Sequence, residues 1–217
     1  MMLVKEYMSK DLKTITPETK INDAIDMMRA FDIHRLPVVA NNTLVGLVTE
    51  GTIHEALPSK ATSLSVYEVN YLLNQTKVAD IMIKNVSTIP DMAILEEAIH
   101  VMRQNKIGVL PVLNEGGQLE GIITNNDIFD AFLEITGYQQ AGTRVAIKID
   151  KDEKGVLSEL TQLFTEHDMN IVQIVVYRYD EHPIIVTQLT TTNVGKLEKI
   201  LSQKPYNILS LIPTEKK

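Results

Sequence analysis

Apolar residues follow the same change of spacing twice within the first part of the chain. Each time, apolar positions three and four residues apart predict a helix, two short β-branched runs around a polar turn predict a hairpin, and a second helical stretch follows. The first copy places these elements at residues 21–28, 36–39, 44–48 and 53–57, and the second places them at 94–102, 108–113, 119–124 and 128–135. The sequence therefore predicts one structural unit that occurs twice.

The two copies are related by a nearly constant difference in residue number. Met8 and Met82 are 74 residues apart, and the difference becomes 75 after an additional residue in the turn at Gly116 and Gly117. Single-residue changes at turns are what repeated structural units tolerate. The predicted organisation is a first repeat at residues 1–58, a connector at 59–76 and a second repeat at 77–137.

The connector carries an apolar stripe outside the repeats. Val66, Val69, Leu72 and Leu73 recur at helical spacing, so we expect a helix with one apolar face. An apolar face that no repeat covers is typical of a contact between protein copies. A homodimer is the expected assembly.

The last third of the chain has a different order of elements. Its pattern predicts a strand, a helix, two strands joined by a turn at residues 180–183, a second helix and a final strand, within residues 143–217. This β-α-β-β-α-β order is the ferredoxin-like arrangement. Residues 137–142, which are polar and contain two glycines, are the predicted hinge. The fold class is therefore mixed α/β (α+β).

Composition and charge narrow the classes of function. The chain has 217 residues with a formal net charge of −7, which disfavours a broad grip on nucleic-acid phosphates. It contains no cysteine, which excludes disulfides and thiolate zinc sites and fits a reducing compartment, so a cytoplasmic location is expected. Its apolar runs are shorter than a membrane span, and we expect neither a nucleic-acid nor a membrane partner.

A short motif ends the hairpin of the second copy. Gly121, Thr124 and Asp127 form a Gly-x-x-Thr-x-x-Asp sequence, whereas the first copy has Gly46 and Thr49 followed by Thr52. Thr124 ends a strand and Asp127 enters a helix, so a hydroxyl and a carboxylate meet at the mouth of a sheet, where a ribose diol would fit them. The plainer alternative is that Asp127 only caps its helix.

The repeated pattern with this motif resembles the CBS domain, which is named after cystathionine β-synthase. The resemblance implies a non-catalytic regulatory protein whose ligand is an adenine nucleotide, AMP, ADP or ATP. It also implies that the base lies against the segment around Val86 and against the strand that holds Ile107, Gly108, Val109 and Pro111. Because Thr52 replaces the acid in the first copy, we expect one functional site.

A second resemblance concerns the phosphates of the nucleotide. His34 and Arg35 stand before Leu36, Pro37 and Val38 as in the strand of the AMP-activated protein kinase γ subunit whose His and Arg contact phosphates. If the two repeats are related by a pseudo-twofold axis, Arg35 of the first copy faces the nucleotide held by the second. Val109, the residue of the second copy that is equivalent to Arg35, is uncharged. A solvated strand end with Arg35 in a surface ion pair is the alternative.

The C-terminal region resembles the ACT domain, a module that senses amino acids or similar small molecules. The resemblance rests on the element order and on residues 151–157, and it makes Gly155 and Val156 the candidate ligand residues at a helix start. Two CBS repeats followed by an ACT-like domain resemble proteins of the acetoin-utilisation (AcuB) type. That resemblance implies regulation of acetoin or acetate catabolism, with a partner enzyme as the target.

Three other functions compete with this interpretation. An enzymatic function is not supported, because the chain has no cysteine nucleophile and no GxSxG or HExxH motif. Its histidines do not have the spacing of metal ligands, so no metal is expected. A dimerisation or docking module whose ligand sites have decayed is the second alternative. It is favoured by the replacement of the motif's acid by Thr52 in the first copy. A sensor of NAD or S-adenosylmethionine is the third alternative, since both ligands carry the same adenosyl ribose.

Overall fold

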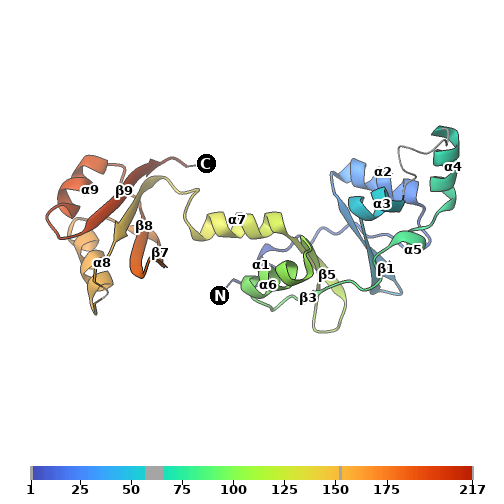
Figure 1. Ribbon diagram of the computed structural model, residues 1–217, viewed down its shortest axis with the longest axis horizontal. Helices are drawn as coiled ribbons and strands as arrows, with labels where there is room; N and C mark the ends of the chain where they lie inside the picture. The colour runs from blue at the N-terminus through green and yellow to red at the C-terminus, as the bar shows by residue number, and fades with distance from the viewer. Residues whose placement is uncertain (1, 57–65, 152, 217) are drawn as a thin grey trace. The chain divides into compact units, whose positions relative to one another are not determined.

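The computed structural model of the protein describes residues 2–56, 66–151 and 153–216. It divides into two compact units, Met1–Ile128 and Phe129–Lys217 (Figure 1). The division falls within helix α7 (Asn125–Ile135), ahead of residues 137–142, which the sequence predicts as the hinge.

The first repeat contains the predicted helix, hairpin and second helix. They are α2 (Ile21–Phe31), β1 (Arg35–Ala40), β2 (Thr43–Thr49) and α3 (Glu50–Ala56). Strands β1 and β2 are antiparallel, and both turn residues, Asn41 and Asn42, have positive φ, of 50° and 63°. This backbone matches the twist of a hairpin and suits asparagine. The apolar residues of α2 and the hairpin pack into one core.

The second repeat has the same elements in the same order. They are β3 (Ile89–Pro90), α6 (Leu95–Asn105), β4 (Val109–Leu113), β5 (Leu119–Thr124) and α7. The short strand β3 runs parallel to β4, with Ile89 opposite Val112, and β4 is antiparallel to β5. In the first repeat a parallel bridge between Ile15 and Val38 takes the place of β3. The predicted duplication is confirmed.

The two repeats exchange their leading helices. Helix α1 (Val4–Tyr7) precedes the first repeat but packs on the second, where the Val4 N–H donates to the Ala93 carbonyl at 2.8 Å. Helix α5 (Val78–Ile81) packs on the first repeat, where the Val78 N–H donates to the Thr19 carbonyl at 2.8 Å. Figure 1 shows the blue α1 among the green elements of the second repeat and the green α5 beside the blue β1. Each core is thus completed by the other copy.

The glycines of the repeated motif permit this exchange. A β-carbon on Gly121 would lie 2.8 Å from Cγ of Met8 and 3.1 Å from the Ser9 carbonyl oxygen. A β-carbon on Gly46 would lie 3.0 Å from Cγ of Met82 and 3.2 Å from the Ile83 carbonyl oxygen. The motif therefore begins with glycine because a neighbouring chain segment passes directly over it.

Substituting alanine for Gly121 should destabilise the first unit by roughly 1–3 kcal/mol, because the methionine and the backbone behind it have to move. The free energy of unfolding in urea would measure this effect. A matched control is Gly195→Ala, where the nearest atom to the new β-carbon lies at 3.9 Å, within a helix. That change should leave stability equal or slightly higher. Equal stability of both variants would contradict the packing argument.

The connector contains the predicted helix, α4 (Val66–Gln75). Leu73 packs against the core of the first repeat, while Tyr67 and Tyr71 are exposed. The side chains of Val66, Val69 and Leu72 lie outside the described residues. The predicted apolar stripe is therefore not described in full, and the homodimer that it suggests stays a prediction.

The second unit has the β-α-β-β-α-β order expected from the sequence. Its elements are β6 (Gly142–Lys148), α8 (Val156–Glu166), β7 (Ile171–Tyr179), β8 (His182–Leu189), α9 (Val194–Leu201) and β9 (Asn207–Thr214). The strands form an antiparallel sheet in the order β7-β8-β6-β9. Both helices pack on one face, around Phe164 and Leu197. This arrangement is ferredoxin-like, whereas its assignment as an ACT domain stays a prediction.

Candidate functional site

The exchanged segments continue past the helices and run along the ends of the two hairpins. Ser9 and Ile122 exchange two backbone hydrogen bonds, at 2.9 and 3.0 Å, and Ile83 and Leu47 do the same, at 2.9 and 3.0 Å. Each hairpin end thus lies beside a segment that leads into the opposite repeat. Two clefts result, and both are built from both repeats.

The first of these clefts, named here the Thr124 cleft, lies at the end of the second hairpin. Its volume is about 240 Å³. It is lined by the segment after α1, by β1 and the residues that lead into it, and by the end of β5: Ser9, Asp11, Leu12, Lys13, Asp32, Ile33, His34, Arg35, Pro37, Ile122 and Thr124.

The other cleft, named here the Thr49 cleft, has a volume of about 370 Å³. Its lining consists of His34, Arg35, Leu47, Thr49, Glu50, Gly51, Ile83, Asn85, Val86, Ser87, Ile107, Gly108 and Val109. Most of these residues are the repeat counterparts of residues that line the Thr124 cleft. For example, Val86 corresponds to Leu12 and Ile107 to Ile33. The two clefts are therefore equivalent positions of a duplicated structure.

The turn after each hairpin differs between the repeats. Oδ2 of Asp127 accepts hydrogen bonds from the Thr124 N–H at 2.6 Å and from the Thr124 hydroxyl at 2.8 Å. In the first repeat, the Thr52 hydroxyl accepts from the Thr49 N–H at 3.0 Å and donates to the Thr49 carbonyl at 2.9 Å. Both side chains thus hold the turn. Only Asp127 keeps a second oxygen, Oδ1, that makes no hydrogen bond within the described residues.

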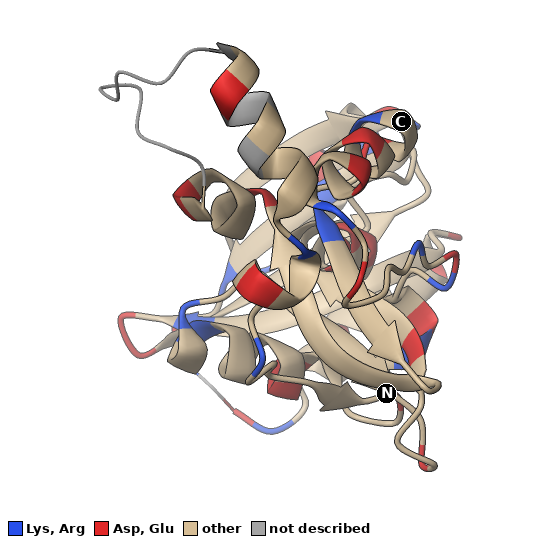
Figure 2. Ribbon diagram, turned by 90° about the vertical axis from the view of Figure 1, so that its right-hand side faces the viewer, with Lys and Arg blue, Asp and Glu red and all other residues tan. Residues whose placement is uncertain are grey.

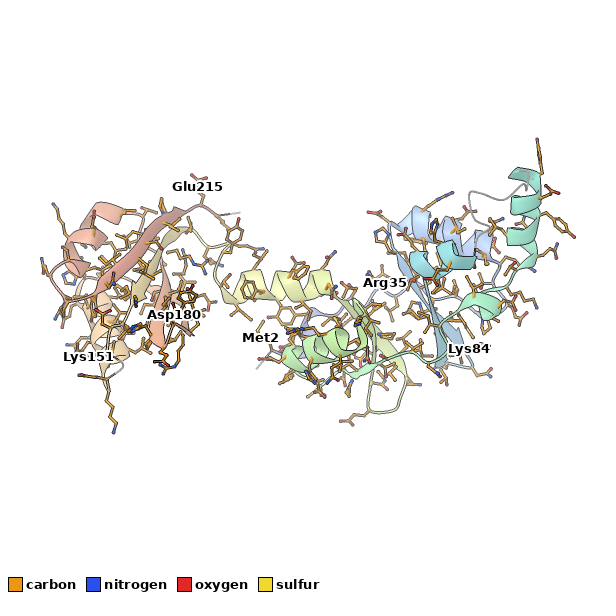
Figure 3. All side chains as sticks on the ribbon, viewed as in Figure 1. Met2, Arg35, Lys84, Lys151, Asp180 and Glu215 are labelled. Atoms are coloured by element: carbon orange, nitrogen blue, oxygen red, sulfur yellow. The ribbon has the colours of Figure 1, made fainter. Side chains whose placement is uncertain are left out.

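Arg35 stands between the clefts and lines both of them. It is half-buried and has no hydrogen-bond or ion-pair partner in the part of the chain that the structure describes. Its Nη2 lies 3.7 Å from the position of a β-carbon on Gly108, so the guanidinium extends from the first repeat to the second; Figure 3 labels this residue. Next to it, Nδ1 of His34 lies 3.0 Å from Oε1 of Glu50. The surface ion pair considered for Arg35 is absent from the described residues.

The structure divides the predicted nucleotide residues between the two clefts. His34, Arg35 and Thr124 meet in the Thr124 cleft, with Asp127 one hydrogen bond behind Thr124. The residues predicted to hold the base of the same nucleotide line the Thr49 cleft instead: Val86, Ile107, Gly108 and Val109. Pro111 is buried and lines neither of these clefts.

The two groups lie in different clefts because each cleft combines the end of one hairpin with segments of the other repeat, and the placement of a nucleotide stays a prediction. The apolar residues that line this cleft with Thr124 come from the first repeat, namely Leu12 after α1, Ile33 before β1 and Pro37 within β1. The sequence pattern does not point to them as ligand residues, although they are the counterparts of Val86, Ile107 and Pro111 in the numbering of the repeat.

The candidate residues of the second unit lie in a separate cleft of about 280 Å³. Gly155 and Val156 line it together with Ile149, Glu153 and Pro183 among others. Gly155 is the N-cap of α8 with a φ of 101°. Nothing here identifies a ligand for this cleft, so the ACT-type ligand residues stay a prediction.

Other kinds of site find little support. Within residues 2–56, 66–151 and 153–216 there is no group of three or more His, Asp or Glu side chains placed to hold a metal ion. None of the described helices is long and apolar enough to cross a membrane. In Figure 2 the Lys and Arg positions are scattered among the Asp and Glu positions.

Comparison with known proteins identifies the repeats. The model of the CBS domain matches residues 4–59 and 78–134, which together make up about half of the chain. A CBS domain-containing protein of Dictyostelium discoideum is 36% identical over 135 residues, which are 62% of this chain and 93% of that protein. An inosine-5'-monophosphate dehydrogenase of Thermoplasma acidophilum is 28% identical over 189 residues, which are 75% of this chain but only 36% of the dehydrogenase.

Solved structures agree with this match. CBSX2 in complex with AMP is 28% identical with a TM-score of 0.51, covering 62% of this chain and 98% of that one. A Vibrio cholerae protein assigned to acetoin utilization (AcuB) is 28% identical with a TM-score of 0.53, covering 64% and 96%. The CBS domain pair of protein MJ0100, in complex with 5'-methylthioadenosine and S-adenosyl-L-methionine, is 26% identical with a TM-score of 0.51, covering 61% and 96%.

Proposed function

This chain belongs to the CBS domain family, and from that premise we propose that it is a non-catalytic sensor that binds an adenine nucleotide in the Thr124 cleft. The observation that carries the proposal is that two groups line one cleft: Thr124, whose turn Asp127 holds through two hydrogen bonds, and the guanidinium of Arg35, which has no partner among the described residues. A carboxylate oxygen suits a ribose diol and a guanidinium suits a phosphate. A nucleotide carries both groups on one molecule.

The charges of the cleft favour a phosphate-bearing ligand, AMP, ADP or ATP. S-adenosylmethionine has no phosphate and, with a sulfonium, an ammonium and one carboxylate, a net positive charge, so it gains less from Arg35 than a nucleotide does. NAD also carries phosphates, so the charges of the cleft do not separate it from AMP, ADP and ATP. Related structures contain AMP in one case and S-adenosyl-L-methionine with 5'-methylthioadenosine in another, so the family accommodates both kinds of adenosyl ligand.

Calorimetry on the full chain with AMP, ADP, ATP, NAD and S-adenosylmethionine tests the proposal. We expect binding of at least one of the three adenine nucleotides, with weaker binding of S-adenosylmethionine. Chromatography of the same mixtures after incubation should recover the nucleotide unchanged, since the proposed role is sensing. If none of the five ligands binds, the protein is better described as a docking module. Turnover of a nucleotide would instead establish an enzyme.

The role of the second unit and the regulated process stay predictions. The likeness to the protein of V. cholerae covers 64% of this chain, the same share that other CBS pairs cover. It therefore supports the CBS pair and does not separate acetoin utilisation from other processes. A partner enzyme of acetoin or acetate catabolism and a homodimer are expectations that pull-down experiments and light scattering can check.

A further inference from the structure

Both clefts are bordered by the same arginine. Arg35 and His34 line the Thr124 cleft and the Thr49 cleft alike, although they occur once in the chain. The repeat counterpart of Arg35 is Val109, and the counterpart of His34 is Gly108, so the second repeat contributes no cation at these positions. The duplication has thus produced two equivalent clefts with one guanidinium between them.

We propose that Arg35 is shared, so that a phosphate-bearing ligand in one cleft excludes a second such ligand from the other. The inference rests on the proposed function, since it assumes that the phosphate of a nucleotide contacts Arg35. A guanidinium that makes a two-pronged contact with one phosphate has its donors aligned in that direction. Its single positive charge then cannot also offset the charge of a second phosphate on the opposite side, and the two phosphates repel each other.

The ribose acceptor decides which cleft is filled first, because only the turn beside the Thr124 cleft holds a carboxylate, that of Asp127. The Thr124 cleft also contains Lys13, whose Nζ lies 2.9 Å from Oδ1 of Asp11, and the carboxylate of Asp32. The Thr49 cleft has no other permanent cation among its lining residues, and it contains the carboxylate of Glu50. Once Arg35 is engaged, a phosphate in the Thr49 cleft would face Glu50 without compensation.

The Thr49 cleft is nevertheless suited to an adenine ring. It is the larger of the two clefts, and its walls include Leu47, Val86, Ile107 and Val109. What it lacks is a cation for the phosphate and a carboxylate for the ribose, because the Thr52 hydroxyl is already bonded to Thr49. Supplying a cation should therefore be enough to admit a second phosphate-bearing ligand.

Calorimetry with AMP, extended to high concentration, measures the sharing directly. The unaltered chain should bind one AMP, with any second AMP at least about tenfold weaker. Ser87→Lys places a lysine in the Thr49 cleft at the counterpart of Lys13, and it should bring the second AMP within about threefold of the first. Ser87→Gln, which is similar in size and uncharged, should behave like the parent. Ser87 is half-buried on a loop segment, so both variants are expected to fold.

A second variant tests the position of Arg35 itself. Val109→Arg provides each cleft with its own guanidinium and should also raise the stoichiometry toward two. Val109 is only 6% exposed, so the circular dichroism spectrum and the melting temperature of the Val109→Arg protein are measured beside the titration. Ser87→Lys adds a cation to the same cleft without changing a buried residue. Asp127→Thr identifies the tighter site, because it should weaken that site alone.

The outcomes separate the sharing of Arg35 from the proposed function. Two equal and independent AMP sites in the unaltered chain would overturn the sharing and leave nucleotide sensing intact. A folded Ser87→Lys protein that still binds a single AMP would overturn it as well. Absence of AMP, ADP and ATP binding in the unaltered chain would instead overturn the proposed function.

Discussion

Replacing Asp127 with alanine should weaken nucleotide binding tenfold to a hundredfold and also lower the melting temperature of the free protein. The loss of binding corresponds to roughly 1.5–3 kcal/mol for a hydrogen-bonded charged group. The loss of stability, about 1 kcal/mol, follows because Oδ2 of Asp127 holds the turn through two hydrogen bonds from Thr124. The ligand role and the structural role therefore coincide in one side chain.

The first repeat supplies the variant that separates these two roles. Thr52 holds the equivalent turn with a hydroxyl, so Asp127→Thr should keep the melting temperature close to that of the parent while binding falls as in the alanine variant. Thr52→Ala is the matched control: it should lower stability by a similar amount and leave the affinity of the Thr124 cleft nearly unchanged. Calorimetry and thermal melts on the three variants measure both quantities. If Asp127→Thr binds AMP as tightly as the parent, Asp127 is a structural residue only.

Replacing Arg35 with glutamine should weaken AMP about tenfold to a hundredfold while changing adenosine less than about threefold, because the lost interaction is a charge-assisted hydrogen bond to phosphate. Arg35 has no partner among the described residues, so no ion pair is broken and stability should be retained. Titration with both ligands provides the comparison. Arg103→Gln, an exposed arginine on α6, should leave both affinities as they are. Equal losses for AMP and adenosine would show that Arg35 does not contact phosphate.

The sequence predicts the elements of this protein well because they depend on local patterns. The spacing of apolar residues located the helices and hairpins of both repeats, and the Asn41–Asn42 and Asp180–Glu181 turns adopt the positive φ values that hairpins favour. The order of the C-terminal elements was sufficient to predict a ferredoxin-like unit, and the observed strand order agrees. In these cases residues close together in the sequence determine which helix, strand or turn forms.

The sequence does not predict which copy a segment packs against. Val4 and Val78 occupy the same position in the two repeats, and each would suit either core, so the pattern alone cannot reveal their exchange. The composition of the clefts depends on that exchange, so the sequence alone does not place Leu12, Ile33 and Pro37 beside Thr124. The pairing of Arg35 with Thr124 was predicted because it followed from the expected symmetry between the copies.

The exchanged helices also bear on how the first unit reaches its folded state. The core of the first repeat is closed by Val78 and the second by Val4, whose backbone N–H is bonded to Ala93. Neither core can close until chain segments far apart in sequence have met, so contacts of long sequence separation dominate the folding barrier. We therefore expect the two repeats to unfold in one cooperative transition and not independently of each other.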